Sequence, residues 1–492
     1  MTHANRNRDS DRTSPLVQNV SRRGFFHQTA TGIHGAALSY LLGQESFGAD
    51  SRSLYDLKPQ APHTGPKAEA VIQLFMQGGP SQMDLLDPKP VLSKNHGQSY
   101  YDEVIADLTG PEQAGTIFRS PFQFQPHGQS GIEVSELLPR LAEVVDDITV
   151  IRSMHTTHPN HEPAVFKFQS GRMIPGLPTL GSWVVYGLGS ENQNLPAFVV
   201  LADPNARFPV NGVQNWHSGL LPPVYQGTPL RSQGSPLLNL KRETEPPFAV
   251  AELERTLLND LDNIHKRDRP GDLQLDARIA SYQLAARMQL TATDALDLSH
   301  ESKHTLAMYG IDKKQTDPFA RRCLMARRLI EKGVRFVQIC TERQIWDNHS
   351  KIVSNLSDCC ARTDQPVAAL LKDLKQRGLL EKTLVIWGGE FGRMPIAQIP
   401  DKTDTSTAGR DHNPRGFTVW MAGGGCKGGS IYGATDELGY RAVEKRVSIA
   451  DWHATILYAL GLNHDKLVFE TAGLEEKLTS VFPAQVLHEL FA

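Results

Sequence analysis

The sequence of 492 residues is poor in cysteine and has no excess of charge of either sign. Its five cysteines are odd in number and include the adjacent pair Cys359 and Cys360, a pattern that predicts neither a disulfide framework nor a zinc ribbon. The 51 basic and 54 acidic residues leave a net charge of −3, so no global field favours nucleic acid or an anionic membrane. We expect no nucleic-acid partner, and any anion-binding property must be local.

Long apolar runs are also missing, because no stretch reaches the roughly 20 residues that cross a bilayer. We therefore expect no transmembrane span. Residues 1–50 start polar and then place Arg22-Arg23 and Phe25-Phe26 ahead of a weakly apolar stretch rich in small residues. This pattern is typical of a twin-arginine signal, with a disordered basic tail as the alternative. The signal predicts that the twin-arginine export machinery carries the chain to the periplasm or cell surface.

Short apolar stretches alternate with stretches of helical period after this segment. The resulting βαβ rhythm predicts an α/β fold, in which helices cover both faces of a mostly parallel sheet. The predicted helices include Val134–Val145, Phe319–Glu331 and Val367–Gln376. The predicted strands are Val71–Met76, Ile148–Ser153, Ala197–Leu201, Val334–Ile339, Leu384–Trp387 and Phe417–Met421.

The rhythm breaks between about residues 204 and 315. There a loop rich in proline and glycine, with Trp216 and Tyr225, precedes a long helical stretch from Phe248 to Tyr309. Because strands resume afterwards, we interpret this region as a helical and loop cap inserted into one domain that spans residues 68–492.

Polar residues that follow the predicted strands are the site candidates, because ligands in such folds bind beyond the carboxyl ends of the strands. The segment after the second strand contains His155, His158 and His161. Pro163 suits the first turn of a helix. That helix would place Asn160 or His161 at its N-terminus, where free N–H groups and the helix dipole favour an anion.

Acidic residues, histidines and arginines follow the other strands. Asp347 and His349 are two residues apart, so an extended chain would present both side chains on one face. Three arginines, Arg393, Arg410 and Arg415, are candidates for binding an oxyanion. The candidate metal ligands are Asp84, Asp347, His349, Glu390, Asp411 and His412. Four carboxylates and two imidazoles at one sheet edge suit one or two divalent cations, namely zinc, manganese or calcium.

The carboxy-terminal part carries a family resemblance. The segments "TLVIWGGEFGRMP", "GRDHNPRGFTVWMAGGGCKGGSIYGATDE" and "IADWHATILYALGL" resemble the exported bacterial proteins grouped as the domain of unknown function 1501 family. More broadly, the chain resembles the alkaline phosphatase and sulfatase superfamily. The resemblance implies that Asp84 binds a metal after the first strand and that Asp347, His349 and His412 bind metal. It also implies that Glu390 stands at a second-metal aspartate, beside Phe391 in place of a histidine.

The nucleophile departs from the family pattern. The segment "HEPAVFKFQSGR" resembles the sulfatase nucleophile segment, with His161 in the position of the modified cysteine or of the phosphatase serine or threonine. Three alternatives stay open. His161 attacks phosphorus itself, Asn160 takes part, or His161 binds a metal while a metal-bound hydroxide attacks.

Two functions are compatible with these residues. The first is an exported, metal-dependent hydrolase of phosphate or sulfate esters, in which Arg393 and the helix start at His161 hold the oxyanion. Its substrate would be a small-molecule or polysaccharide ester. The alternative is a non-catalytic binding or envelope protein that a metal stabilises.

Overall fold

The structure is a computed structural model that describes residues 57–202, 209–232, 247–269, 272–399, 405–471 and 473–492. The predicted export signal in residues 1–50 lies outside the described residues. The part from Leu57 onward clusters as one unit by its internal contacts. The predicted domain boundary at residue 68 and the predicted insertion limits stay predictions.

A mixed sheet forms the centre of the fold, and the described residues contribute nine strands to it. All neighbouring strands pair in parallel except those beside β13, which is antiparallel to β5 and β9. The α/β fold with a mostly parallel sheet is therefore confirmed. In spatial order the strands are β14 (Ser430–Tyr432), β5 (Ile148–His155), β13 (Phe417–Ala422), β9 (Thr383–Gly388), β1 (Ala70–Phe75), β8 (Phe336–Cys340), β6 (Phe198–Leu201) and β7 (Thr228–Leu230), with β17 (Val447–Ser448) also pairing with β5.

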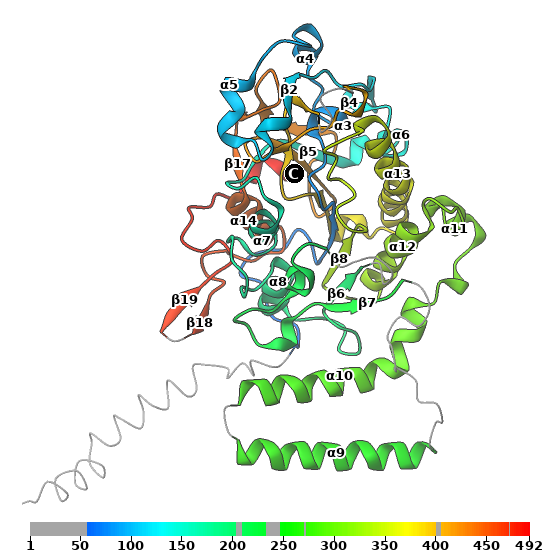
Figure 1. The fold of residues 1–492 in the computed structure, drawn as a ribbon. Helices are drawn as coiled ribbons and strands as arrows, with labels where there is room; N and C mark the ends of the chain where they lie inside the picture. Colours follow the sequence, from blue (N-terminus) through cyan, green and yellow to red (C-terminus); the bar gives the residue numbers. More distant parts are fainter. Residues whose placement is uncertain (1–56, 203–208, 233–246, 270–271, 400–404, 472) are drawn as a thin grey trace, which may run out of the picture. The chain divides into compact units, whose positions relative to one another are not determined.

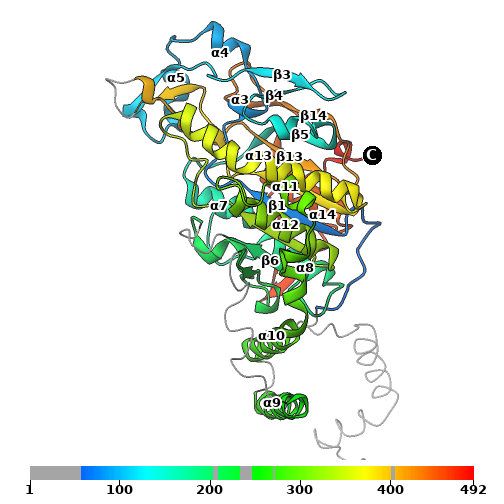
Figure 2. The same ribbon diagram turned by 90° about the vertical axis from the view of Figure 1, so that its right-hand side faces the viewer.

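Helices cover both faces of this sheet (Figures 1 and 2). Helices α12 and α13 lie on one face, and α7, α8 and α14 lie on the other. The helices are α3 (Gln82–Leu85), α4 (Pro90–Lys94), α5 (Tyr101–Val104), α6 (Pro139–Ala142), α7 (His161–Ser170), α8 (Leu180–Leu188), α9 (Phe248–Asp268), α10 (Leu273–Leu296), α11 (Lys303–Tyr309), α12 (Asp317–Glu331), α13 (Ile352–Gln376) and α14 (Ile449–Ala459).

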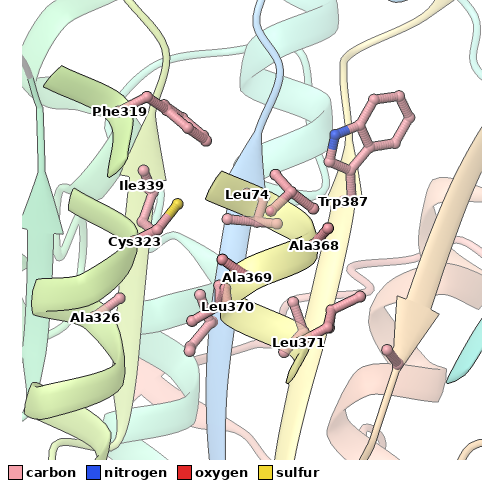
Figure 3. Packing of buried hydrophobic residues seen from close by; sticks show 14 of the residues in the cluster. Leu74, Phe319, Cys323, Ala326, Ile339, Ala368, Ala369, Leu370, Leu371 and Trp387 are labelled. Carbon is pink, nitrogen blue, oxygen red and sulfur yellow. The ribbon is translucent and has the colours of Figure 1, made fainter. Parts of the chain in front are cut away.

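The alternation of side chains along β1 explains why both faces need cover. Leu74 packs with residues of α12 and α13 in the large hydrophobic cluster (Figure 3). The next residue, Phe75, points to the opposite face and stacks on Phe168 of α7, with ring centroids 5.7 Å apart. Successive side chains of a strand point to opposite faces, and both sets are apolar here, so helices must exclude water from both.

One predicted helix is wrong. Residues 134–145 contain the end of strand β4 (Ile132–Ser135), the short helix α6 and a 3-10 turn. Strand β4 pairs with β3 (Phe124–His127) in a small antiparallel sheet, and α6 starts at Pro139, which suits the first turn of a helix. The apolar residues of this stretch therefore serve two elements. The helix predicted at 367–376 is the second half of α13, which continues through Pro366.

The inserted region adds an edge strand and packs on the helical layer. Strand β7 extends the sheet in parallel with β6, and α10 contacts α12. Trp216 and Tyr225 are buried, so these two aromatic residues contribute to packing instead of forming an exposed face. None of the described helices combines the length and the apolar character that crossing a membrane requires.

Four small antiparallel ribbons and strand pairs complete the described part of the fold. They hold the loops that extend from the sheet edge, and one of them carries His412. The pairs are β10 (Gly392–Arg393) with β12 (His412–Asn413), β2 (Ala114–Ile117) with β11 (Ile396–Gln398), β15 (Ala434–Thr435) with β16 (Ala442–Glu444), and β18 (Phe469–Thr471) with β19 (Leu474–Glu476).

Candidate metal centre

The sheet topology brings the predicted site residues to one edge. Strands β9, β1 and β8 are parallel neighbours, so their carboxyl ends lie side by side. Strand β13 runs the other way, so its beginning lies at that same edge. His412 precedes β13 in the chain, and Asp347 follows β8. The single antiparallel strand is thus the reason that His412 reaches the end of its parallel neighbours.

Three imidazoles converge on one carboxylate oxygen. Asp347 Oδ1 lies 2.9 Å from His349 Nε2, 3.1 Å from His412 Nε2 and 3.3 Å from His161 Nε2. One ligand atom from each of these four residues lies within 4.8 Å of the other three. His161 stands at the first position of α7, as the position of Pro163 predicted. Four residues from three separate chain segments therefore meet at one point.

The outer nitrogens of two of these histidines have acceptors behind them. His161 Nδ1 lies 2.6 Å from Glu390 Oε1, and His349 Nδ1 contacts Gln398 Oε1. A carboxylate or amide oxygen is an acceptor, so both rings carry a proton on Nδ1, and Nε2 is the nitrogen that would bind a cation at the centre. This is the arrangement by which proteins orient metal-ligating histidines. His161 Nε2 is itself buried without a hydrogen-bond partner.

Packing orients the third ring. His412 lies with its centroid 4.5 Å from that of Phe391, 4.5 Å from that of His349 and 4.3 Å from that of His161. Its Nδ1 is buried without a hydrogen-bond partner. Phe391, at the position where the resemblance implies a lost histidine ligand, is therefore an apolar wall of the centre.

Arg393 holds Asp347 in place. Its Nη2 donates to Asp347 Oδ1 at 2.7 Å, its Nε donates to Gly79 O at 2.9 Å, and its Nη1 donates to Arg410 O at 3.0 Å. The guanidinium is buried, and all three of its nitrogens have acceptors. The sequence had suggested that Arg393 binds a substrate oxyanion. In the structure its guanidinium contacts Asp347 and backbone carbonyls instead.

Glu390 lies behind His161 rather than beside Asp347. Its two oxygens accept from Gly78 N at 3.0 and 3.2 Å, and its side chain is fully buried. Gly78 has a φ of +115°, and a Cβ there would lie 2.5 Å from Asp347 N, so only glycine permits this close approach. The structure therefore gives Glu390 a supporting contact with His161, in place of the direct ligand position that we expected.

Asp84 and Asp411 are also engaged elsewhere. Asp84 forms a fully buried, two-pronged ion pair with Arg410, at 2.7 and 3.2 Å. Asp411 accepts from the backbone N–H groups of Thr109 at 2.8 Å, Gly110 at 3.0 Å and His412 at 2.8 Å. The structure thus places neither carboxylate at the expected ligand position, and it occupies Arg410 with Asp84.

Charge in this region favours a cation. Asp347, Glu390 and Asp411 are three carboxylates, and Arg393 is the one guanidinium that contacts them in the described residues. When the three imidazoles are neutral, as metal ligands must be, these groups leave a buried excess of two negative charges, which is costly. A divalent cation on Asp347 and the three imidazoles would offset that excess, so the donor set and the charge both fit a metal ion.

The pKa shifts of Asp347, His161 and His412 reflect the charges that surround them. Burial opposes the charge on Asp347, but Arg393 and the three histidines hold its pKa well below its usual range. Burial also opposes charge on His161, yet its contacts with Asp347 and Glu390 raise its pKa to about 9. Burial lowers the pKa of His412 to about 3, helped by Arg393 and His161. His161 favours the proton because the carboxylate of Glu390 lies 2.6 Å from its Nδ1, in addition to its contact with Asp347.

Asn160 is the remaining predicted residue. It occupies the N-cap position of α7 with φ −87° and ψ 142°, and its side chain makes no capping hydrogen bond. The residue is exposed. Asn160 therefore presents an amide to solvent beside His161, where it can contact a bound molecule.

Sequence reasoning missed Gln398 and Thr109. Gln398 orients His349 and in turn donates from Nε2 to Gln113 Oε1 at 2.9 Å. Thr109 donates to Asp411 through both its N–H and its hydroxyl. A glutamine inside the apolar run "MPIAQIP" was a usable signal for the first, whereas the loop around Thr109 has no comparable signal.

Comparison with known proteins places the chain in a family. Residues 68–491 match the family described as "Protein of unknown function (DUF1501)". The chain belongs to this family. The resemblance in the carboxy-terminal segments is thereby confirmed. None of the curated proteins matches this DUF1501 chain.

Solved structures similar to this DUF1501 protein include sulfatases and phosphatases. The PsFucS1 sulfatase from Pseudoalteromonas sp. is 13% identical, with a TM-score of 0.35 over 81% of this chain and 68% of that chain. The lipoteichoic acid synthase LtaP from Listeria monocytogenes is 8% identical, with a TM-score of 0.33 over 83% and 77%. The alkaline phosphatase from the Antarctic bacterium TAB5 is 11% identical, with a TM-score of 0.31 over 75% and 94%. Likeness at this level says nothing about substrate.

Proposed function

We propose that this DUF1501 protein is a metal-dependent hydrolase of sulfate or phosphate esters with one cation at the centre. The convergence of three imidazole nitrogens and Arg393 on Asp347 Oδ1 supports this proposal. His161, His349, His412 and Asp347 would hold the cation. Three nitrogen donors and one carboxylate favour zinc or manganese over calcium, which prefers six or more oxygen ligands. The bound cation would supply Lewis acidity to the ester oxygens.

The chain's own groups would do the remaining work. Glu390 and Gln398 fix His161 and His349 in the tautomer that faces the cation. Phe391 excludes water from one side. The first turn of α7 offers free backbone N–H groups, and Asn160 adds a side-chain amide, so both can hold an ester oxygen. In this proposal His161 binds the cation and is not the nucleophile, so water attacks the ester.

The proposal is tested by elemental analysis combined with a panel of aryl sulfate, aryl phosphate and phosphodiester substrates. We expect about one zinc or manganese per wild-type chain, and loss of both metal and turnover in Asp347→Asn. Asp358→Asn, on the exposed side of α13, is the matched control and should keep both. Turnover that survives in Asp347→Asn at zero metal content would refute the hydrolase.

A further variant separates the two roles of His161. His161→Ala should lose metal as well as turnover if the imidazole is a ligand. Full metal content together with a phosphorylated histidine in acid-quenched wild-type protein would instead assign it as the nucleophile.

A second candidate function rests on a specific observation. Two of the three arginines that were candidates for binding the oxyanion, Arg393 and Arg410, are buried and occupied. A non-catalytic binding or envelope protein, with the metal in a stabilising role, would need no such group. Bound metal without turnover on any ester of the panel, together with a lower melting temperature after metal removal, would favour this alternative.

We also propose that the chain is exported. Arg22-Arg23 and Phe25-Phe26 support this part of the proposal. Replacing both arginines with lysine should keep the protein in the cytoplasm, as cell fractionation would show, and unchanged fractionation would contradict a twin-arginine signal.

A further inference from the structure

A pocket lined by arginines is built partly from the segment that carries His412. Arg415, Arg441 and Arg446 line a cavity of about 330 Å³ together with Ala442 and Val443. Arg415 comes three residues after His412 in the chain. Arg415 belongs to the loop before β13, and the other lining residues belong to the segment around β16.

The backbone connects this basic pocket directly with the centre. Pro414 O accepts from Thr156 N at 2.8 Å, and Thr156 begins the loop that leads to Asn160 and His161. Residues 156–161 and 412–415 are therefore hydrogen-bonded to each other, and these two segments carry His161 and His412 of the candidate cation site as well as Arg415 of the basic pocket. Three residues of extended chain span at most about 11 Å, so the Cα atoms of His412 and Arg415 lie within that distance of each other.

The three arginines differ in how strongly they are engaged. Arg415 is fixed by a two-pronged ion pair with Asp107, at 2.8 and 2.7 Å, and its side chain remains about half exposed, at 52%. Arg441 lies over the Tyr440 ring, with 4.8 Å between its guanidinium carbon and the ring centroid. Arg446 is exposed. In the described part of the chain, no carboxylate forms an ion pair with Arg441 or Arg446.

The surroundings of the pocket keep the positive field. Burial lowers the pKa of His155, at the end of β5, and Arg446, Lys167 and Arg415 lower it further against the opposing charge of Asp451. The carboxylate of Asp451 is engaged by the backbone and hydroxyl of Ser448 and by Gln485 N. Three cations and one carboxylate thus act on His155 at this end of β5.

The net positive charge of the metal centre is too small to attract a second anion. A divalent cation there would only balance the two excess carboxylates, and the centre's own arginines are occupied. Two guanidinium groups that form no ion pair with a carboxylate in the described residues, at the border of a cavity, add anion-binding groups to those at the start of α7.

We propose that the basic pocket binds a second anionic ester group of a substrate whose reacting ester lies at the metal centre. The natural substrate is then a chain that carries several sulfate or phosphate groups, not a single monoester. This inference rests on the proposed hydrolase for its catalytic part, whereas the binding of a polyanion to the pocket is independent of it.

The test uses the full-length protein and the double variant Arg441→Gln/Arg446→Gln. A charge-assisted hydrogen bond contributes about 1.5–3 kcal/mol, so we expect the dissociation constant for dextran sulfate or polyphosphate to rise at least about tenfold. KM for an oligomeric substrate should rise similarly, while kcat/KM for an aryl monoester stays unchanged. Lys445→Gln, in the same turn but paired with Glu489, is the matched control for loss of one charge.

The outcomes separate the pocket from the hydrolase. Tighter binding of dextran sulfate than of polyphosphate would assign sulfate groups, and the reverse would assign phosphate. Binding that persists in Asp347→Asn without turnover supports the basic pocket even if the hydrolase fails. Equal binding by wild type and the double variant, or an equal loss in Lys445→Gln, would overturn the inference, and thermal melting of each variant would verify that it is folded.

Discussion

Replacing Glu390 with glutamine should weaken metal binding although Glu390 does not reach the cation. Its carboxylate accepts a 2.6 Å contact from His161 Nδ1 and contacts of 3.0 and 3.2 Å from Gly78 N. A glutamine can keep an oxygen at the Oε1 position, where it accepts from both donors, but its NH₂ group then replaces Oε2 and faces Gly78 N, donor against donor. The imidazole also loses the negative charge that strengthens Nε2 as a ligand.

Changes of this kind typically reduce metal affinity by about 10–100-fold, or about 1.4–2.8 kcal/mol. We expect the upper part of this range for Glu390→Gln, because His161 loses a charged acceptor and the side chain is fully buried. Competition with a zinc-binding fluorescent chelator would measure the change in dissociation constant. Glu301→Gln is the matched control, since Glu301 is also largely buried and pairs with Arg327 and Arg328. Unchanged zinc affinity in Glu390→Gln would refute the supporting role.

Two further predictions concern stability. Asp84→Asn leaves Arg410 buried without a carboxylate, so it should lower the free energy of unfolding, measured in urea, by about 3–5 kcal/mol. The folded variant should keep its metal. Loss of the metal would instead indicate that Asp84 is a ligand. Burial lowers the pKa of His453 from 6.5 to about 4, so the unfolded chain binds a proton between these values that the native chain does not bind. Stability should therefore fall as pH drops from 6.5 to 4, by about 3 kcal/mol. His453→Gln, which can still donate to Phe168 O, should show a shallower pH dependence in chelator, and identical slopes would contradict the prediction.

The sheet was predictable because its strands are buried on both faces. Six predicted strands agree with the structure to within about two residues at each end, since a parallel strand between two helical layers reads as a short apolar run with abrupt ends. The helix predicted at residues 134–145 was wrong for the opposite reason. Its apolar residues belong partly to a strand and partly to a turn of helix, and no local signal shows where one ends and the other begins.

The sequence could show which polar side chains gather at the sheet edge, but not which of them face one another. Pro163 and the histidines before it predicted His161 at a helix start, and the spacing of Asp347 and His349 predicted a shared face. The pairing of Asp84 with Arg410 joins positions 326 residues apart. Such a contact depends on how loops pack above the strands, and neither periodicity nor turn chemistry carries that information.

The contacts of the four carboxylates that were predicted as ligands determine how many cations the site can hold. Asp84 is neutralised by Arg410, Asp411 is surrounded by backbone N–H groups, and Glu390 faces the outer nitrogen of His161. Only Asp347 remains to bind a cation directly. A second cation near Glu390 would have to displace the proton on His161 Nδ1 and would meet Phe391 where a ligand is required. In the described residues, the proposed cation therefore has ligands for one site, and the other three carboxylates contact the groups around it.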